Sequence, residues 1–340
     1  MKKIPVEDAV GQILCHDMTA ILENGFKGVK FKRGHIIIKE DIPSLLNIGK
    51  SHIYIWNPGA DEIHEDDAGL AITQAICGEN LTFSGPQEGK YQISALIKGL
   101  FCVNGQALKQ INSIDDYTIA CRPNHTAVSD GESVAGARIV PLVTMRNNVT
   151  KAVKIARENS PVFELKPFIP LKTGIIITGS EIYYGRIKDQ FEPIMRKKLD
   201  FYGADILGVR KCPDDLEHLS TAINYYKQQG AQLILLTGGM SVDPDDLTPT
   251  AIKNSGASMI TQGVPMQPGN MLTMAYLEDS LLIGVPGASM HSKFTSLDIF
   301  LPRIFAGEKI SHDDIAGLGE GGFCMKCQVC HYPICYFGRK

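Results

Sequence analysis

The sequence predicts an α/β protein in which a mainly parallel, doubly wound sheet follows smaller, mostly β domains. The sheet is predicted from residue 174 onward, where short apolar runs at 174–178, 206–209 and 233–236 alternate with helical stripes. The β-rich part is predicted before about residue 159, where short apolar runs are separated by Gly, Asn and Asp. A chain of 340 residues exceeds one ordinary domain of roughly 100 to 200 residues, so several domains are expected.

The order of these patterns predicts four parts along the chain. A proline-rich stretch from about residue 159 marks the main boundary, because each proline disfavours helix in the residue before it. The expected parts are a small β-rich domain at 1–57, an α+β domain at 58–160, an α/β domain at 173–310 and a cysteine-rich tail at 320–340. Before the boundary we expect a helix at 62–76 and strands at 52–56, 91–96, 99–103, 117–120 and 138–143.

Composition favours an ordinary globular protein of the cytoplasm. Apolar residues make up 44% of the chain, charged residues 21%, and the formal net charge is -3, which gives no sign of a nucleic-acid partner. The opening segment is too polar for a signal peptide, and no run approaches the roughly 18 apolar residues of a membrane span. A cytoplasmic location without membrane contact is therefore expected.

Two helices are predicted between the strands of the α/β domain. The first carries an apolar stripe from Ile187 to Tyr202 and stops at Gly203, and the second runs from Leu216 to Tyr226 and stops at Gly230. Since parallel strands connected in this way end at one edge of the sheet, ligands are expected beyond their carboxyl ends. The loops after the strands at 174–178, 206–209 and 233–236, and the loop after Val285, are the places where a site is predicted.

Those loops carry the candidate site residues. Glycines let backbone N–H groups approach an oxyanion such as phosphate, and hydroxyl groups add further donors. Carboxylates beside an anion imply a bridging cation, and oxygen-rich sites favour Mg²⁺. Each motif also has a simpler explanation, since Gly-Gly can be a tight turn and Asp-Asp a helix cap. The candidates are Thr178, Gly179, Ser180 and Glu181 in the first loop, Asp214 and Asp215 in the second, and Thr237, Gly238, Gly239, Met240, Ser241 and Asp246 in the third.

This series of motifs resembles the molybdopterin molybdotransferases, a family that includes the E domain of gephyrin. The order Thr-Gly-x-Glu, Asp-Asp, Gly-Gly-x-Ser with a later Asp, Pro-Gly and Pro-Gly runs through most of residues 173–305. The resemblance implies a molybdopterin-binding domain with Glu181, Asp215 and Asp246 as the acidic residues of metal insertion. It adds Pro268, Gly269, Pro286 and Gly287 to the substrate-binding residues.

What the resemblance implies is an enzyme of molybdenum cofactor biosynthesis. Such an enzyme inserts molybdate into adenylated molybdopterin, releases AMP, uses Mg²⁺ and acts as a homodimer. The implied partners are adenylated molybdopterin, molybdate, a second copy of the chain, and a molybdoenzyme or another protein of the cofactor pathway.

Three departures from the family pattern keep two alternatives open. Asp243 replaces a glycine, Gln267 replaces a lysine, and Gly287-Ala288-Ser289-Met290 replaces Gly-Asn-Pro. These changes favour a non-catalytic carrier or sensor of molybdopterin or of the finished cofactor. A molybdopterin adenylyltransferase is the third hypothesis, disfavoured by the segments that precede residue 160.

The tail carries four of the nine cysteines within the last 17 residues. Four thiolates so close in sequence suit one tetrahedral zinc ion or an iron–sulfur cluster, because soft sulfur ligands select both. The spacing differs from the bacterial ferredoxin run, in which the last gap is shorter and a proline follows the last cysteine. The alternative is a flexible, reduced tail. The predicted metal ligands are Cys324, Cys327, Cys330 and Cys335.

Overall fold

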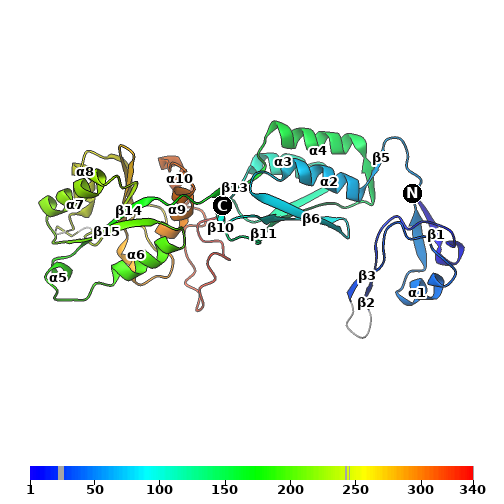
Figure 1. Cartoon of the computed structure of the whole chain (residues 1–340), viewed down its shortest axis with the longest axis horizontal. Helices are drawn as coiled ribbons and strands as arrows, with labels where there is room; N and C mark the ends of the chain where they lie inside the picture. Colours follow the sequence, from blue (N-terminus) through cyan, green and yellow to red (C-terminus); the bar gives the residue numbers. More distant parts are fainter. Residues whose placement is uncertain (22–26, 242, 245, 340) are drawn as a thin grey trace. The chain divides into compact units, whose positions relative to one another are not determined.

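The computed structural model describes residues 1–21, 27–241, 243, 244 and 246–339. The chain folds into two compact units (Figure 1). None of the helices in the described ranges is both long and apolar enough to cross a bilayer. The first unit comprises Met1–Leu96, Val103–Arg122 and Asp130–Glu164, and the second comprises Ile97–Cys102, Pro123–Ser129 and Leu165–Lys340.

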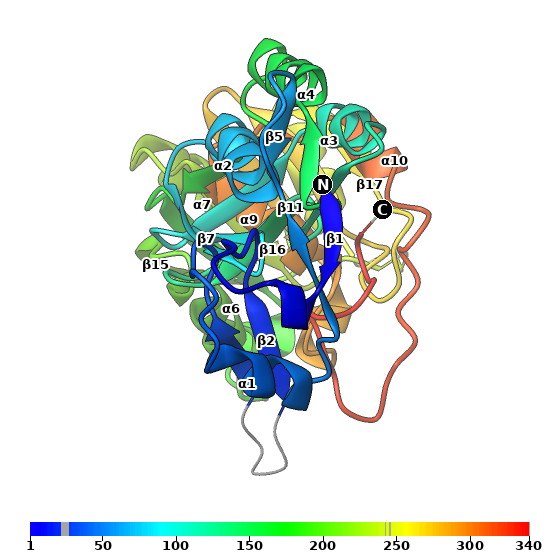
Figure 2. The same cartoon turned by 90° about the vertical axis from the view of Figure 1, so that its right-hand side faces the viewer.

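The first unit begins with two small antiparallel sheets. Strand β1 (Lys2–Pro5) pairs with β4 (His52–Ile55), and β2 (Met18–Ile21) pairs with β3 (Lys27–Phe31). The 3-10 helix η1 (Val6–Asp8) follows β1 and contacts helix α1 (Asp41–Asn47), which the sequence did not predict and which is drawn in blue near the bottom of Figure 2. These elements share an apolar core that includes Val6, Leu45 and Ile53. The strand predicted at 52–56 is confirmed.

An antiparallel sheet with helices forms the rest of the first unit. Its strand order is β6-β7-β11-β9, and α2, α3 and α4 lie together on one side of it (Figure 1). A separate two-stranded pair joins β5 to β12. The bounds are β5 (Glu62–His64), α2 (Glu65–Ile76), β6 (Leu81–Gln87), β7 (Lys90–Ala95), α3 (Gly105–Asn112), β9 (Tyr117–Cys121), β11 (Ser133–Ile139), β12 (Val143–Met145) and α4 (Arg146–Glu158).

Two predicted elements of this unit differ from the structure. The helix predicted at 62–76 begins three residues later, because Glu62–His64 is the strand β5 and the ring of His64 accepts a hydrogen bond from the Asp66 N–H at 3.1 Å, which caps α2. The strand predicted at 138–143 is wrong: β11 ends at Ile139 and β12 begins at Val143. Pro141, which has no N–H to donate to a ladder, lies in the gap.

The second unit contains a six-stranded sheet of order β15-β14-β16-β19-β18-β17. The first four strands are parallel, and β18 and β17 extend the sheet in antiparallel fashion. The predicted α/β fold with a mainly parallel sheet is therefore confirmed. A small sheet of order β10-β8-β13 is also present. The strands are β8 (Gly99–Val103), β10 (Thr126–Val128), β13 (Phe163–Pro167), β14 (Lys172–Thr178), β15 (Asp205–Cys212), β16 (Leu233–Thr237), β17 (Ser258–Gln262), β18 (Thr273–Leu277) and β19 (Ser280–Val285).

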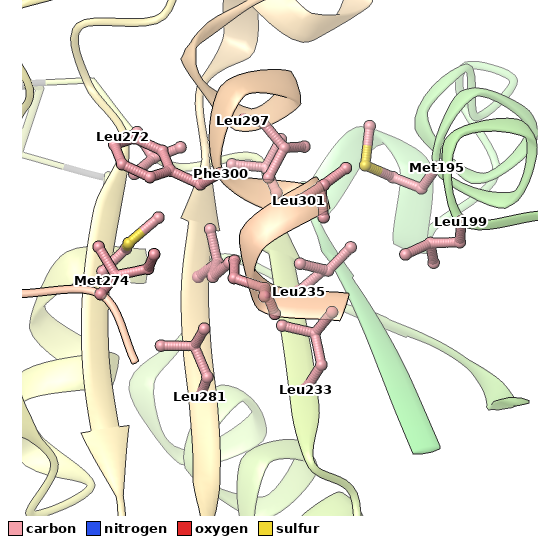
Figure 3. Close-up of a cluster of buried hydrophobic side chains, with 14 of the residues drawn as sticks. Met195, Leu199, Leu233, Leu235, Leu272, Met274, Leu281, Leu297, Phe300 and Leu301 are labelled. Atoms are coloured by element: carbon pink, nitrogen blue, oxygen red, sulfur yellow. The ribbon is translucent and has the colours of Figure 1, made fainter. Parts of the chain in front are cut away.

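Helices cover both faces of the six-stranded sheet. On one face α6 and α9 contribute to a core that contains Met195, Leu235 and Phe300 (Figure 3). On the other face α7 and α8 pack against Ile234 and Leu236 of the same central strand. The strands are apolar on both sides because both faces are covered, as the runs of Ile and Leu predicted. The helices are α5 (Ser180–Tyr183), α6 (Phe191–Asp200), α7 (Leu216–Gln228), α8 (Thr248–Asn254), η2 (Gly287–Met290), α9 (Ser296–Phe305) and α10 (His312–Ala316).

The two predicted helices of the sheet are present, although the first starts later than expected. Helix α6 begins at Phe191 rather than near Ile187. The carboxylate of Asp189 accepts hydrogen bonds from the N–H groups of Phe191 and Glu192 at 2.8 and 3.4 Å, so this side chain satisfies the amide groups that open the helix. Ile187 is exposed and takes no part in the apolar stripe.

Candidate functional site

The loops predicted to carry the site begin side by side. Thr178 at the end of β14 pairs with Cys212 at the end of β15, and Ile177 pairs with Thr237 at the end of β16. The acidic and glycine-rich segments therefore leave the sheet at one edge, the carboxyl edge of its parallel strands. This is the position at which doubly wound sheets bind ligands. Val242 and Asp245 of the third loop lie outside the described residues.

Asp214 ties the first two loops together. Its carboxylate accepts hydrogen bonds at 2.8 Å from the hydroxyl of Thr178 and from the backbone N–H of Ser180. In return, the backbone N–H of Asp214 donates to the hydroxyl of Ser180 at 3.2 Å. Both side-chain oxygens of Asp214 are thus occupied within the protein. Asp214, Thr178 and Ser180 therefore form a hydrogen-bonded frame that joins the two loops.

Asp215 caps helix α7. Its Oδ1 accepts hydrogen bonds from the N–H groups of Glu217 and His218 at 2.7 and 3.1 Å, and the His218 ring lies 3.1 Å from Oδ2. The hydrogen bonds from the His218 backbone and ring are the main causes that lower the pKa of the Asp215 carboxyl. The capping alternative considered for Asp-Asp therefore applies to this residue. Both oxygens of this carboxylate are thus engaged, so a cation would have to share Oδ2 with the His218 ring.

Glycine is required where the first and third loops meet. A Cβ on Gly238 would lie 2.2 Å from the carbonyl oxygen of Thr178, and its φ of +88° is in the left-handed region. The hydroxyl of Thr248 donates to the Gly238 carbonyl at 2.8 Å, while its N–H donates to the Gly239 carbonyl at 3.2 Å. Thr248, at the start of α8, therefore holds the Gly238-Gly239 turn in place through these two hydrogen bonds. Gly179, at φ +147°, allows the matching turn of the first loop.

The hydroxyl group of Thr237 has no hydrogen-bond partner in the part of the chain that the structure describes. The residue has 0% exposure, and its Oγ1 is buried without a hydrogen-bond partner among the described residues. A buried hydroxyl in this state costs free energy unless a ligand or water satisfies it. Met240, by contrast, is 4% exposed and packs over Gly284, where a Cβ would lie 2.7 Å from the Met240 sulfur. The Met240 side chain is thus a packing residue, while Ser241 after it is exposed.

The two Pro-Gly segments lie at the same edge. Thr273, which opens β18, pairs with Gly284 near the end of β19, so Pro268 and Gly269 before β18 and Pro286 and Gly287 after β19 flank that end of the sheet. The hydroxyl of Ser296 donates to the Gly269 carbonyl at 2.6 Å, and its N–H donates to the Pro268 carbonyl at 3.2 Å. Gly269 has φ +107°, and a Cβ there would lie 2.5 Å from the Ser296 hydroxyl. The start of α9 therefore holds this segment in place.

Glu181 and Asp246 occupy separate loops of the edge. Glu181 is exposed at the start of α5, and Asp246 is half-buried before α8, with its carboxylate accepting a hydrogen bond from the Asp243 N–H at 3.3 Å. Within the described ranges, Glu181, Asp215 and Asp246 do not form a group whose ligand oxygens all lie within 4.8 Å of one another. A Mg²⁺ ion would therefore meet one or two of these carboxylates, together with oxygens of the substrate. Mg²⁺ commonly binds phosphorylated substrates in this way.

The group that does meet this distance criterion in the described part of the chain is Cys102, His125 and Glu308. Sequence analysis did not predict it, because its members lie far apart in the chain. Glu308 accepts hydrogen bonds from Arg303 at 2.7 Å and from Lys166 at 3.0 Å. Burial alone would raise the pKa of Glu308, but the hydrogen bonds from Arg303 and Lys166 hold it below its ordinary value. Two neighbouring cations disfavour a metal ion, so this group is a half-buried ion-pair network.

Comparison with known proteins bears on the α/β domain. Residues 174–306 match the family described as "Probable molybdopterin binding domain". Those residues belong to that family. Residues 3–57 match a second family that is described only as a domain of unknown function.

Several curated proteins align with part of the chain. A molybdopterin molybdenumtransferase of Synechococcus elongatus is 24% identical over 176 residues, which are 49% of this chain and 44% of that protein. A molybdopterin molybdenumtransferase of Bacillus subtilis is 29% identical over 121 residues, 34% of this chain and 28% of that protein. The chain thus spans less than half the length of these relatives. A CinA-like protein of Mycobacterium tuberculosis is 29% identical over 80 residues, 24% of this chain and 19% of that protein.

Solved structures show weaker global similarity. The molybdopterin biosynthesis enzyme MoaB from Thermus thermophilus is 16% identical with a TM-score of 0.34, covering 41% of this chain and 98% of that one. A molybdenum cofactor biosynthesis protein from Pyrococcus furiosus is 13% identical with a TM-score of 0.25, covering 91% of this chain and 66% of that one. Both scores are low, and no conclusion about activity follows from these two structures.

Proposed function

We propose that the protein acts in molybdenum cofactor biosynthesis and binds adenylated molybdopterin at the carboxyl edge of the six-stranded sheet. The observation that carries the proposal is the convergence of the loops after β14, β15 and β16, with the buried Thr237 hydroxyl lacking an internal partner among the described residues. Backbone N–H groups of the Gly238-Gly239 turn would orient the terminal phosphate of the pterin. The family match of residues 174–306 supports this ligand.

The reaction proposed for this site is the insertion of molybdate with release of AMP. Glu181, Asp215 and Asp246 would hold Mg²⁺, one or two of them at a time, along with substrate oxygens. The bound Mg²⁺ supplies a positive charge that offsets the negative charge of molybdate and pyrophosphate. The chain itself positions the substrate through the frame of Asp214, Thr178 and Ser180, whose hydrogen bonds fix the two loops relative to each other.

AMP release tests the activity directly. Purified protein would be mixed with adenylated molybdopterin, molybdate and Mg²⁺, and AMP measured by chromatography. We expect turnover in the wild type, a large loss in Asp246→Ala and no loss in Asp205→Ala, since Asp205 begins β15 at the opposite end of the strand from the site. If the wild type released no AMP, or if Asp246→Ala and Asp205→Ala behaved alike, insertion at this site would be ruled out.

The alternative of a carrier or sensor rests on specific residues. Gln267 and Asp243 replace residues of the family pattern, and the Asp215 carboxylate is already engaged in capping α7. Binding of molybdopterin or of the finished cofactor, without AMP release, would select this function. Adenylation of the pterin from ATP would instead select the adenylyltransferase hypothesis.

A homodimer and contacts with a molybdoenzyme or another protein of the cofactor pathway are proposed on the resemblance alone. Light scattering at several protein concentrations tests the dimer. A monomer at every concentration would overturn it.

A further inference from the structure

The four cysteines of the tail line one cavity. The cavity has a volume of about 320 Å³, and Cys324, Cys327, Cys330 and Cys335 are all among its lining residues. Cys327 and Cys330 are exposed, whereas Cys324 and Cys335 are half-buried and pack against the apolar core below α9. The tail thus brings its thiols to one side of the second unit, around a single hollow.

Two anchors hold the segment that carries these cysteines. At its start, the N–H of Gln267 donates to the Gly322 carbonyl and the N–H of Cys324 donates to the Gln267 carbonyl, both at 2.8 Å. At its end, the hydroxyl of Tyr332 donates to the Asp298 carbonyl at 3.2 Å, and Phe337 is buried in the core. The sequence between the anchors is short, so its four thiols remain near the cavity.

The local geometry around the first Cys-x-x-Cys suits a thiolate ligand. The backbone N–H of Lys326 points at the sulfur of Cys324, at 3.5 Å, and Lys326 has a φ of +52°. Hydrogen bonds from backbone N–H groups to ligand sulfurs tune thiolate metal centres. Lys326, Lys293 and His331 also line the cavity. The positive charges of Lys326 and Lys293 would offset the net negative charge of a centre with four thiolates.

We propose that Cys324, Cys327, Cys330 and Cys335 bind one thiophilic metal centre in this cavity, either a zinc ion or an iron–sulfur cluster. Four sulfur ligands satisfy the coordination of both. Binding replaces the proton of each thiol by a bond to the metal, and the protons pass to solvent. In the described structure no three of these sulfurs lie within 4.8 Å of one another, so binding of a single zinc ion would draw the exposed Cys327 and Cys330 toward Cys324 and Cys335.

Gln267 connects the cysteine segment to the candidate site. Gln267 pairs with Phe323, which directly precedes Cys324, and Gln267 itself directly precedes the Pro268-Gly269 segment of the candidate site. A metal centre that fixes Cys324 therefore also fixes the backbone that precedes β18 at the carboxyl edge. This consequence concerns the protein without its pterin ligand and does not depend on which ligand the edge binds.

Metal content of the full chain tests the proposal. Protein purified without oxygen, and reduced protein incubated with Zn²⁺ or with Fe²⁺ and sulfide, would be assayed for zinc, iron and acid-labile sulfide. We expect one zinc per chain, or iron together with sulfide, and loss of that metal in Cys327→Ser/Cys330→Ser. Cys121→Ser, in β9 of the first unit, should keep the metal. Absence of bound metal under every condition, or equal content in all variants, would overturn the proposal.

Hydrogen exchange tests the link to the candidate site. In the metal-loaded wild type, the amides of Gln267 and Cys324 should exchange slowly, and removal of the metal by a chelator should accelerate them. The Cys327→Ser/Cys330→Ser variant should resemble the chelated protein, whereas Cys121→Ser should not. If these amides exchanged at the same rate with and without bound metal, the link to the candidate site would be refuted, even if the metal itself binds.

Discussion

Replacing Gly238 by alanine should both strain the backbone and push the first and third loops of the candidate site apart. A residue with a Cβ at positive φ costs roughly 1–2 kcal/mol relative to glycine. At Gly238, where φ is +88°, the new Cβ would also lie 2.2 Å from the Thr178 carbonyl oxygen, so the first and third loops must move apart. Such overpacking typically adds about 1–3 kcal/mol.

Gly203→Ala is the matched control. Gly203 has φ +70°, but a Cβ added there would have nothing within 4 Å, so only the backbone cost of about 1–2 kcal/mol applies. Denaturant unfolding would measure both stabilities, and fluorescence or calorimetric titration would measure the affinity for adenylated molybdopterin. We expect Gly238→Ala to be the less stable variant and to lose most of its affinity, while Gly203→Ala binds like the wild type. Equal stability losses with unchanged binding in both variants would refute the argument.

Further predictions concern the core, the ion-pair network and the loop frame. Leu235→Ala, at 0% exposure, should lower the free energy of unfolding by about 2–5 kcal/mol in denaturant titrations. Glu308→Gln should cost about 2–4 kcal/mol at neutral pH, since it removes the half-buried negative charge to which Arg303 and Lys166 donate. Because the folded pKa of Glu308 is lowered, that stabilisation is complete above its ordinary value of 4.5 and is lost as the pH falls through the folded value. Asp214→Ala should cost about 1–3 kcal/mol and weaken pterin binding in the same titration.

The sequence predicted the parallel part of the sheet because each strand there is followed by a helix with its own apolar stripe. It did not predict that β17 and β18 extend the sheet in antiparallel fashion. Strands β18 and β19 are joined by a hairpin at Glu278 and Asp279, and short apolar runs of this kind do not reveal their direction. Local capping explains two further differences, since the side chains of His64 and Asp189 decide where α2 and α6 begin.

The candidate site was predictable in position but not in the role of each side chain. Strand ends and glycine-rich loops located the edge, because parallel strands must end together. Hydrogen bonds decide which carboxylates can still bind a cation. The Asp214 carboxylate accepts hydrogen bonds from Thr178 and Ser180, and the Asp215 carboxylate caps α7. Met240 packs inward against Gly284, and the Thr237 hydroxyl has no hydrogen-bond partner among the described residues. Both features depend on neighbours in three dimensions, which one sequence does not specify.

Hydrogen exchange with and without adenylated molybdopterin tests the central claim most directly, because it locates the ligand. The account predicts protection of the backbone at 178–183, 212–216, 237–241 and 267–270, the segments at the carboxyl edge of the sheet. Peptides at the opposite end of the strands, such as those around Asp205, should be unchanged. Protection elsewhere with no change at these segments would contradict the claim that this edge holds the pterin.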